Sequence, residues 1–409
     1  ATQFVDRGSS LLDLGRSDEA ISDFSRALAL DQKNATALAN RGIAQVWKGE
    51  LTAAVVDLDA AAAIDPSHPV VFRARGLMAE QKGDYKGAIE AYTSALAVEP
   101  GNDFALGHRA IAYRGAGDDD AALKDSEAAL KLNSQWVDLY VLRANIFRVR
   151  GNAEEGLKQA AALGAGDYTD PYPYVAAANI YSAFKKDEDA MSMFARAITI
   201  KPEPYIYLNR SLRRPKTDVA NRKADLDAAL KLDPEYAEAL AAKAKLEEES
   251  GNFAGAIALY TASLREAPGD IGILVSRGIA YARSQDPTRA EKDFASARAK
   301  VSKPVELNNI CWNKATAGIA LEAALSECNS ALAAEPDVPG FLDSRGLVLL
   351  RLGRLDDAIA DYDRALSKAP QMPTSLFGRA IALARKGEKE KSDIDRAAAL
   401  KADPGVEMR

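Results

Sequence analysis

The sequence predicts an all-α protein built from about twelve copies of a two-helix unit. Arginine recurs every 34 residues, and after a gap the series resumes in the same phase: Arg7, Arg41, Arg75, Arg109, Arg143, Arg277, Arg345 and Arg379. A fixed period of this length is typical of helix–turn–helix repeats. Within each period, small and apolar residues recur at helical spacing. Such an array has one continuous core and offers surfaces rather than catalytic pockets.

The repeat unit is clearest in the third copy, residues 69–102. A first helix is predicted from about Pro69 to Lys82, and Gly83 ends it. A second helix is predicted from Asp84 to Val98, and Glu99-Pro100 ends it. Glycine accepts a left-handed backbone and proline cannot donate to the preceding turn, so both residues stop helices.

These positions resemble the tetratricopeptide repeat (TPR) family. The eleventh copy carries the family's small, aromatic and proline residues at the expected spacing: Gly346, Gly353, Ala358, Tyr362, Ala365 and Pro370. The resemblance covers nearly all 409 residues. It implies a right-handed superhelical solenoid of about twelve repeats and some 24 helices, winding through about one and a half turns.

Most of the recurring residues are predicted to pack. Glycines at one repeat position would let the two helices approach closely, at Gly8, Gly42, Gly76, Gly278 and Gly346. An aromatic stripe at another position is predicted to fill the core: Phe24, Tyr92, Phe194, Tyr260, Phe294 and Tyr362. Aspartate follows many of the periodic arginines by sixteen residues, which predicts Arg–Asp bridges within a repeat or to the adjacent one: Asp23, Asp57, Asp125, Asp293, Asp361 and Asp395.

Irregular repeats divide the chain into three parts. Residues 1–166 are predicted to be an N-terminal array of about five repeats, and residues 237–409 a C-terminal array of about five with a solvated end cap. Residues 167–236 are irregular and form a candidate hinge. There Lys186 takes the place of the turn glycine, and Arg213-Arg214-Pro215-Lys216 should end a helix early.

Composition argues against several classes of function. The chain has 53 basic and 59 acidic residues and a net charge of −6, so it lacks the basic footprint of a general nucleic-acid-binding protein. No run of about 18 apolar residues predicts a membrane span. No catalytic motif occurs, and the only histidines, His68 and His108, do not have metal-ligand spacing. We therefore predict no enzyme activity, no cofactor and no metal.

Two cysteines leave the compartment open. Cys311 and Cys328 both lie in the tenth copy, at the positions expected for the arginine and the aromatic residue. They are either two buried free thiols or a disulfide, and a disulfide would favour the bacterial periplasm over the cytoplasm. Trp312 would then occupy the close-packing glycine position, so this copy should pack differently from its neighbours.

The TPR resemblance implies a protein or peptide partner, held in the groove formed by the first helices of the repeats. Groove positions in copies four to seven carry polar and aromatic side chains, which can bond a peptide backbone and supply contact area. The predicted partner-binding residues are His108, Arg114, Asn145, Arg148, Tyr172, Asn179, Tyr205 and Asn209. Self-association through the groove remains an alternative, and the family's clamp for acidic C-termini is not found.

A narrower resemblance covers copies ten to twelve. Residues 308–317 and 342–346 are similar to the C-terminal TPR region of large bacterial proteins that carry a transglutaminase-like or peptidase-like domain upstream. The resemblance implies an alternative role, as the non-catalytic part of a larger envelope enzyme.

Overall fold

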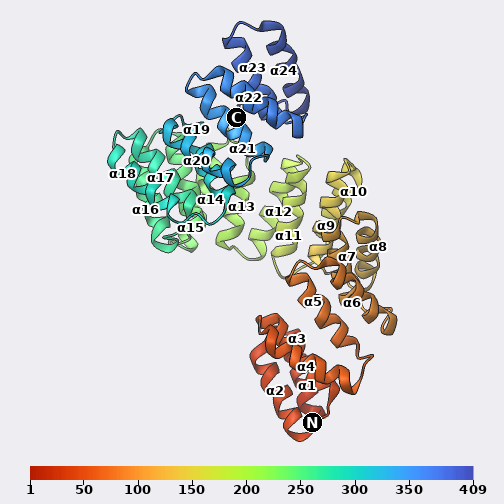
Figure 1. Cartoon of the computed structure of the whole chain (residues 1–409). Helices are drawn as coiled ribbons and strands as arrows, with labels where there is room; N and C mark the ends of the chain where they lie inside the picture. Colours follow the sequence, from red (N-terminus) through yellow and green to blue (C-terminus); the bar gives the residue numbers. More distant parts are fainter. Residues whose placement is uncertain (409) are drawn as a thin grey trace. The chain divides into compact units, whose positions relative to one another are not determined.

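The computed structural model describes residues 1–408 and is all-α, as predicted (Figure 1). Within those residues it contains 24 α-helices and one short 3₁₀ helix. Consecutive helices pair as hairpins, so the helices make twelve two-helix repeats. The chain separates into two compact units, Ala1–Lys201 and the residues from Pro202 onward. The boundary lies within the predicted irregular part, residues 167–236, and the three-part division stays a prediction.

Unit 1 holds the first six repeats. Its helices are α1 Thr2–Asp13, α2 Ser17–Leu30, α3 Ala35–Lys48, α4 Leu51–Ile64, α5 Pro69–Gln81, α6 Tyr85–Val98, α7 Asp103–Ala116, α8 Asp119–Leu132, α9 Val137–Val149, α10 Ala153–Ala165, α11 Tyr172–Ala183 and α12 Asp187–Ile200.

Unit 2 holds the last six repeats. Its helices are α13 Pro204–Arg213, α14 Val219–Leu232, α15 Ala237–Glu249, α16 Phe253–Glu266, α17 Ile271–Arg283, α18 Pro287–Arg298, α19 Pro304–Ala317, α20 Leu321–Ala334, α21 Pro339–Arg351, α22 Leu355–Lys368, α23 Pro373–Arg385, α24 Lys389–Ala402 and the 3₁₀ helix η1 Val406–Met408. Helix α13 is only ten residues long and ends just before Arg214-Pro215, as predicted.

The turn inside each repeat uses a left-handed residue. Glycine supplies it in most repeats, for example Gly83 with φ 72°. Gln285 takes this conformation in the ninth repeat and Lys185 in the sixth. The prediction that Lys186 replaces the turn glycine was therefore wrong by one residue, because the shortened sixth repeat shifts the register between its helices.

The two helices of a repeat meet where a glycine faces a large side chain. We number residues within a repeat so that Gly8 is at position 8 and Phe24 at position 24. A Cβ placed on Gly346 would lie 2.7 Å from the ring of Tyr362, and one on Gly278 would lie 2.6 Å from the ring of Phe294. The position-24 aromatics are almost fully buried: Phe24, Tyr92, Phe194, Tyr260, Phe294 and Tyr362. The predicted close approach and aromatic core are confirmed.

Six Arg–Asp pairs join the helices within single repeats. In each pair the guanidinium Nε and Nη2 donate to the two carboxylate oxygens: Arg7–Asp23, Arg41–Asp57, Arg109–Asp125, Arg277–Asp293, Arg345–Asp361 and Arg379–Asp395. All six aspartates are buried. This confirms the predicted bridges and places them inside each repeat. We call them the Arg–Asp ladder.

Two periodic arginines depart from the ladder. Arg75 has no aspartate sixteen residues later and instead bonds Asp59 of the preceding repeat at 2.9 Å. Arg143 donates from Nε to the side-chain oxygen of Gln159 at 3.1 Å. In the shortened seventh repeat the pairing survives with a spacing of fifteen residues, as Arg210–Asp225.

We predict that Gly346→Ala destabilises the protein by about 1–3 kcal/mol, because the added methyl group would overlap the Tyr362 ring. Gly340 provides a control in the same helix, since a Cβ there meets nothing within 4 Å. Gly340→Ala should raise stability by up to about 1 kcal/mol through helix propensity. Urea unfolding measures both, and equal effects would contradict the close approach.

For the ladder, Arg345→Ala should lower the free energy of unfolding by about 2 kcal/mol, because it leaves the buried Asp361 carboxylate without its donor. Adding Asp361→Ala should cost little more. Arg354→Ala, which breaks the exposed pair with Asp357, should cost less than about 0.5 kcal/mol. Additive losses in the Arg345/Asp361 double-mutant cycle would refute the pairing.

Candidate functional site

The predicted groove residue His108 lies on α7 in an aromatic cluster. Its Nδ1 is 3.1 Å from Glu80 Oε2, and its ring centroid is 4.3 Å from that of Phe104 and 5.5 Å from that of Trp136. Only 20% of its side chain is exposed. His108 therefore contributes to packing between repeats as well as to the surface.

The other predicted residues of unit 1 differ in their engagement. Arg114 Nη1 donates to Asp119 Oδ1 at 2.6 Å, within its own repeat. Asn145 and Arg148 are exposed on α9. Tyr172 is 47% exposed and its hydroxyl donates to Asp138 Oδ1 at 2.8 Å. Asn179 is half-buried on α11. A partner would have to compete with the contacts of Arg114 and Tyr172.

Tyr205 and Asn209 belong to unit 2. Both are half-buried on α13, and Asn209 Nδ2 donates to the carbonyl oxygen of Tyr205 at 2.8 Å. Because the eight predicted residues are divided between the two units, one continuous binding face across all of them stays a prediction.

Sequence reasoning missed a cavity in unit 1. It has a volume of about 340 Å³ and is lined mainly by α1, α3, α5 and the start of α7, which are all first helices of repeats. Its lining includes Asn40, Trp47, Arg73 and Phe104. Trp47 is 44% exposed, and Arg73 Nη1 donates to Glu99 Oε2 at 3.2 Å. The recurrence of first-helix positions was the signal that could have found this cavity.

A second cavity, of about 190 Å³, lies in unit 2. We call it the C-terminal cavity. Its walls come from the first helices α19, α21 and α23, with Tyr362 of α22 and the end of the chain completing it. The apolar lining residues are Trp312, Leu347, Leu350, Phe377, Ile381 and Val406. The polar and charged ones include Asp343, Arg351 and Glu407. This surface is apolar with a few convergent polar groups, as ligand sites usually are.

Asp343 is the unusual member of the C-terminal cavity. Only 5% of the residue is exposed, and Ser375 Oγ donates to its Oδ1 at 2.6 Å. No salt bridge within residues 1–408 includes it. Burial disfavours the charged form and raises the pKa of the Asp343 carboxyl above its usual value, while hydrogen bonds from Ser375 and Thr374 partly oppose the shift.

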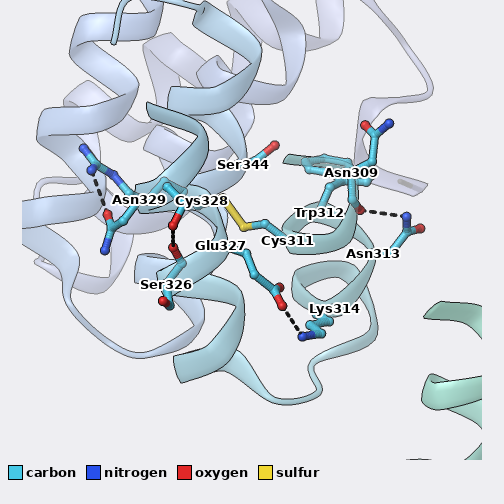
Figure 2. Close-up of a disulfide and its surroundings, with 12 residues drawn as sticks. Asn309, Cys311, Trp312, Asn313, Lys314, Ser326, Glu327, Cys328, Asn329 and Ser344 are labelled. Carbon is cyan, nitrogen blue, oxygen red and sulfur yellow. Dashed lines mark hydrogen bonds and ion pairs between the residues drawn. A yellow bond between two sulfur atoms is a disulfide. The ribbon is translucent and has the colours of Figure 1, made fainter. Parts of the chain in front are cut away.

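The tenth repeat contains a disulfide between α19 and α20. Figure 2 shows Cys311 bonded to Cys328, with a Cα–Cα distance of 5.6 Å. Both cysteines are fully buried. Cys328 occupies position 24, where other repeats place an aromatic ring. Cys311 occupies position 8, because Gly318 is the turn glycine and Ala320 lengthens the following turn by one residue.

The predicted positions of Cys311 and Trp312 were therefore wrong by one residue. The extra turn residue precedes α20, so counting back from that helix misplaced every residue of α19. Ile310, not Cys311, takes the ladder arginine's position, and Trp312 follows the close-packing position on the cavity side of α19. The expectation that this repeat packs differently holds, with a disulfide in place of the glycine–ring contact.

A buried ion pair replaces the ladder in this repeat. Lys314 is fully buried, and its Nζ lies 2.6 Å from Glu327 Oε1 and 4.3 Å from the ring centroid of Phe294 (Figure 2). Arg298 Nη1 also donates to Glu327 Oε1, at 3.1 Å. Burial lowers the pKa of Lys314, and Glu327 partly restores it. Glu327 occupies the ladder aspartate's position, so the charge reverses direction without being lost.

Two other searches of residues 1–408 complete the description. No group of three or more His, Cys, Asp or Glu side chains is arranged to hold a metal ion. None of the described helices has the length and apolar character needed to span a bilayer.

Comparison with known proteins identifies the family. A tetratricopeptide repeat family model matches residues 5–69, 223–271 and 344–407, and a second tetratricopeptide repeat model matches residues 172–204. Together they cover slightly more than half of the chain. The chain belongs to the tetratricopeptide repeat family.

Solved structures agree with this fold. The crystal structure of yeast Tom70 is similar with a TM-score of 0.51 and 16% sequence identity, over 100% of this chain and 95% of that one. A tetratricopeptide repeat protein from Parabacteroides merdae has a TM-score of 0.42 and 19% identity, over 60% and 97% of the two chains. Pseudomonas aeruginosa pilF has a TM-score of 0.41 and 16% identity, over 49% and 91%.

No curated protein matches the chain. None of these comparisons supports the resemblance of residues 308–317 and 342–346 to transglutaminase-like or peptidase-associated proteins.

The raised pKa of Asp343 makes a stability prediction. Between the ordinary carboxyl pKa of 3.8 and the raised value, the folded state keeps a proton that the unfolded state releases, so stability falls as pH rises through that window. Asn cannot titrate. Asp343→Asn should therefore gain stability relative to wild type between about pH 3 and about pH 7.

Thermal unfolding across this pH range tests the prediction. Asp337→Asn is the control, because Asp337 is exposed on the loop before α21. The neighbouring titratable groups are Tyr362 on α22 and Arg351 on α21. Identical pH profiles for wild type and Asp343→Asn would show that Asp343 is not held in its uncharged form.

Proposed function

We propose that this protein is a non-catalytic scaffold that binds extended segments of a partner protein along the first helices of its repeats. TPR proteins generally mediate protein–protein interaction. The observation that carries the proposal is that, in each unit, first helices of successive repeats line a cavity with aromatic, apolar and polar side chains. An extended peptide can follow such a surface, placing side chains in the cavities and its backbone against polar groups.

The unit 1 cavity offers suitable chemistry for this role. Trp47 supplies a large exposed ring, and Asn40 supplies an amide that can both donate and accept a hydrogen bond. Rigid aromatic and arginine anchors dominate the binding energy of many interfaces. Tyr172 and Tyr205 remain the predicted anchors in copies six and seven.

The test begins with a partner captured by crosslinking to the intact chain and then purified. Trp47→Ala, and separately Tyr172→Ala with Tyr205→Ala, should each raise the Kd tenfold or more, which corresponds to about 1.4 kcal/mol. Val56→Ala is the control, because Val56 is 65% exposed on the second helix α4. If both groove variants bind the purified partner as tightly as wild type, the functional surface lies elsewhere.

The disulfide supports a further proposal, that the protein works in an oxidising compartment such as the bacterial periplasm. The bond should be present in protein purified without reductant, because both cysteines are buried and bonded to each other. Thiol titration under denaturing conditions should then find no free thiol. Two titratable thiols would remove the support for that compartment.

The alternative role, as the non-catalytic region of a larger envelope enzyme, rests on residues 308–317 and 342–346 alone. A catalytic domain encoded upstream in the same reading frame would favour it over the scaffold role.

A further inference from the structure

We propose that the C-terminal cavity binds a lysine or arginine side chain of a partner peptide, with Asp343 as its counter-charge. This inference rests on the proposed function, because it names the chemistry of one subsite of the peptide-binding surface. It is carried by three features of the cavity: a buried carboxyl without a cation, apolar and aromatic walls, and a small volume.

The first feature is the unmatched acid. The aspartates of the Arg–Asp ladder are buried to a similar degree as Asp343, and each receives two donors from an arginine. Asp343 instead receives a hydroxyl from Ser375. Because a buried carboxylate is unfavourable without an opposite charge, a cation from outside the chain would stabilise its ionised form.

The other charges at the cavity do not make the same demand. Glu407 is already bonded to Arg396, whose Nε lies 2.8 Å from its Oε1. Arg351 is exposed, so water solvates its guanidinium, and its Nη2 donates to the carbonyl oxygen of Thr316 at 3.2 Å. A cation is favoured there by the C-terminal end of α19. The unmatched charge at this site is therefore negative.

The second feature is the walls. Trp312 of α19, Leu347 of α21, and Phe377 and Ile381 of α23 surround the acid with apolar surface. Lysine and arginine side chains bury their methylene stems against such surfaces while their charged ends reach a polar group. The faces of tryptophan and phenylalanine also attract cations. A neutral apolar side chain would fill the walls but leave Asp343 unmatched.

The third feature is size. A volume of about 190 Å³ lies below the roughly 300–1,000 Å³ of sites that hold a whole small molecule. It suits one side chain of a larger ligand. The cavity lies on first helices, where the proposed function places an extended peptide, so the remainder of that peptide can continue along α19 and α17.

The experiment uses the full chain and four fluorescein-labelled octapeptide pools with blocked ends. The pools differ only in one fixed central residue, which is Lys, Arg, norleucine or Glu. By fluorescence anisotropy, the Lys or the Arg pool should bind with a Kd about fivefold or more below that of the norleucine pool. Asp343→Asn should abolish this preference, because the amide oxygen can still accept from Ser375 Oγ but carries no charge.

The matched control is Asp337→Asn, which makes the same change of charge at an exposed position in the same unit and should leave the preference intact. Far-ultraviolet circular dichroism checks that both variants are folded. Trp312→Ala is a second variant, which should weaken binding of the Lys and Arg pools by removing a wall.

The outcomes separate this inference from the proposed function. Equal binding of the Lys, Arg and norleucine pools, or a preference that survives Asp343→Asn, overturns the cation subsite while peptide binding stands. Tightest binding of the Glu pool overturns it in favour of Arg351 as an anion receptor. No binding of any pool up to about 1 mM overturns it and also counts against a peptide-binding groove.

Discussion

The close approach of two helices within each repeat is the constraint on which the structure depends. It requires a small residue at position 8, because the ring or side chain at position 24 occupies the space where a Cβ would lie. Gly8, Gly76, Gly278 and Gly346 each meet an aromatic ring in this way, and Gly42 meets Leu58. The ladder arginine lies one residue before this contact and its aspartate one residue before the ring. The packed contact and the ion pair therefore hold the same crossing point from the core and from the surface.

The tenth repeat meets the constraint by other means. A disulfide joins positions 8 and 24, and the buried Lys314–Glu327 pair replaces the arginine and aspartate. Trp312 directly follows Cys311 on α19, so the covalent bond also anchors the helix that presents this indole to the C-terminal cavity. A repeat that lost its ring thus keeps a rigid first helix next to a candidate binding surface.

The contrast between the ladder and Asp343 separates structural from functional charge in this protein. The ladder aspartates are buried and matched, and their periodic recurrence follows from repeat geometry. Asp343 is buried and unmatched, and it occurs in one repeat on the cavity side of a first helix. In an array where most residues are explained by packing, a buried polar group that departs from the repeated pattern is the more informative guide to a binding site.

The sequence by itself determined the fold, the repeat boundaries, the close-packing glycines, the aromatic core and the Arg–Asp ladder. These features follow from local spacing that is repeated many times, so an error in one repeat does not obscure the pattern. It could not determine register where a turn gains or loses a residue, which is why Lys186 was expected at the position of Lys185 and Trp312 at that of Cys311.

Only the tertiary structure decided which groove positions form cavities and which acids lack a cation. Asp343, Ser375 and Phe377 are separated along the chain and come together only when α21 and α23 pack side by side. The predicted eight-residue groove was drawn from repeat positions alone, which record the face of a helix but not the neighbours that cover it. Burial and pairing depend on those neighbours, and no single repeat contains them.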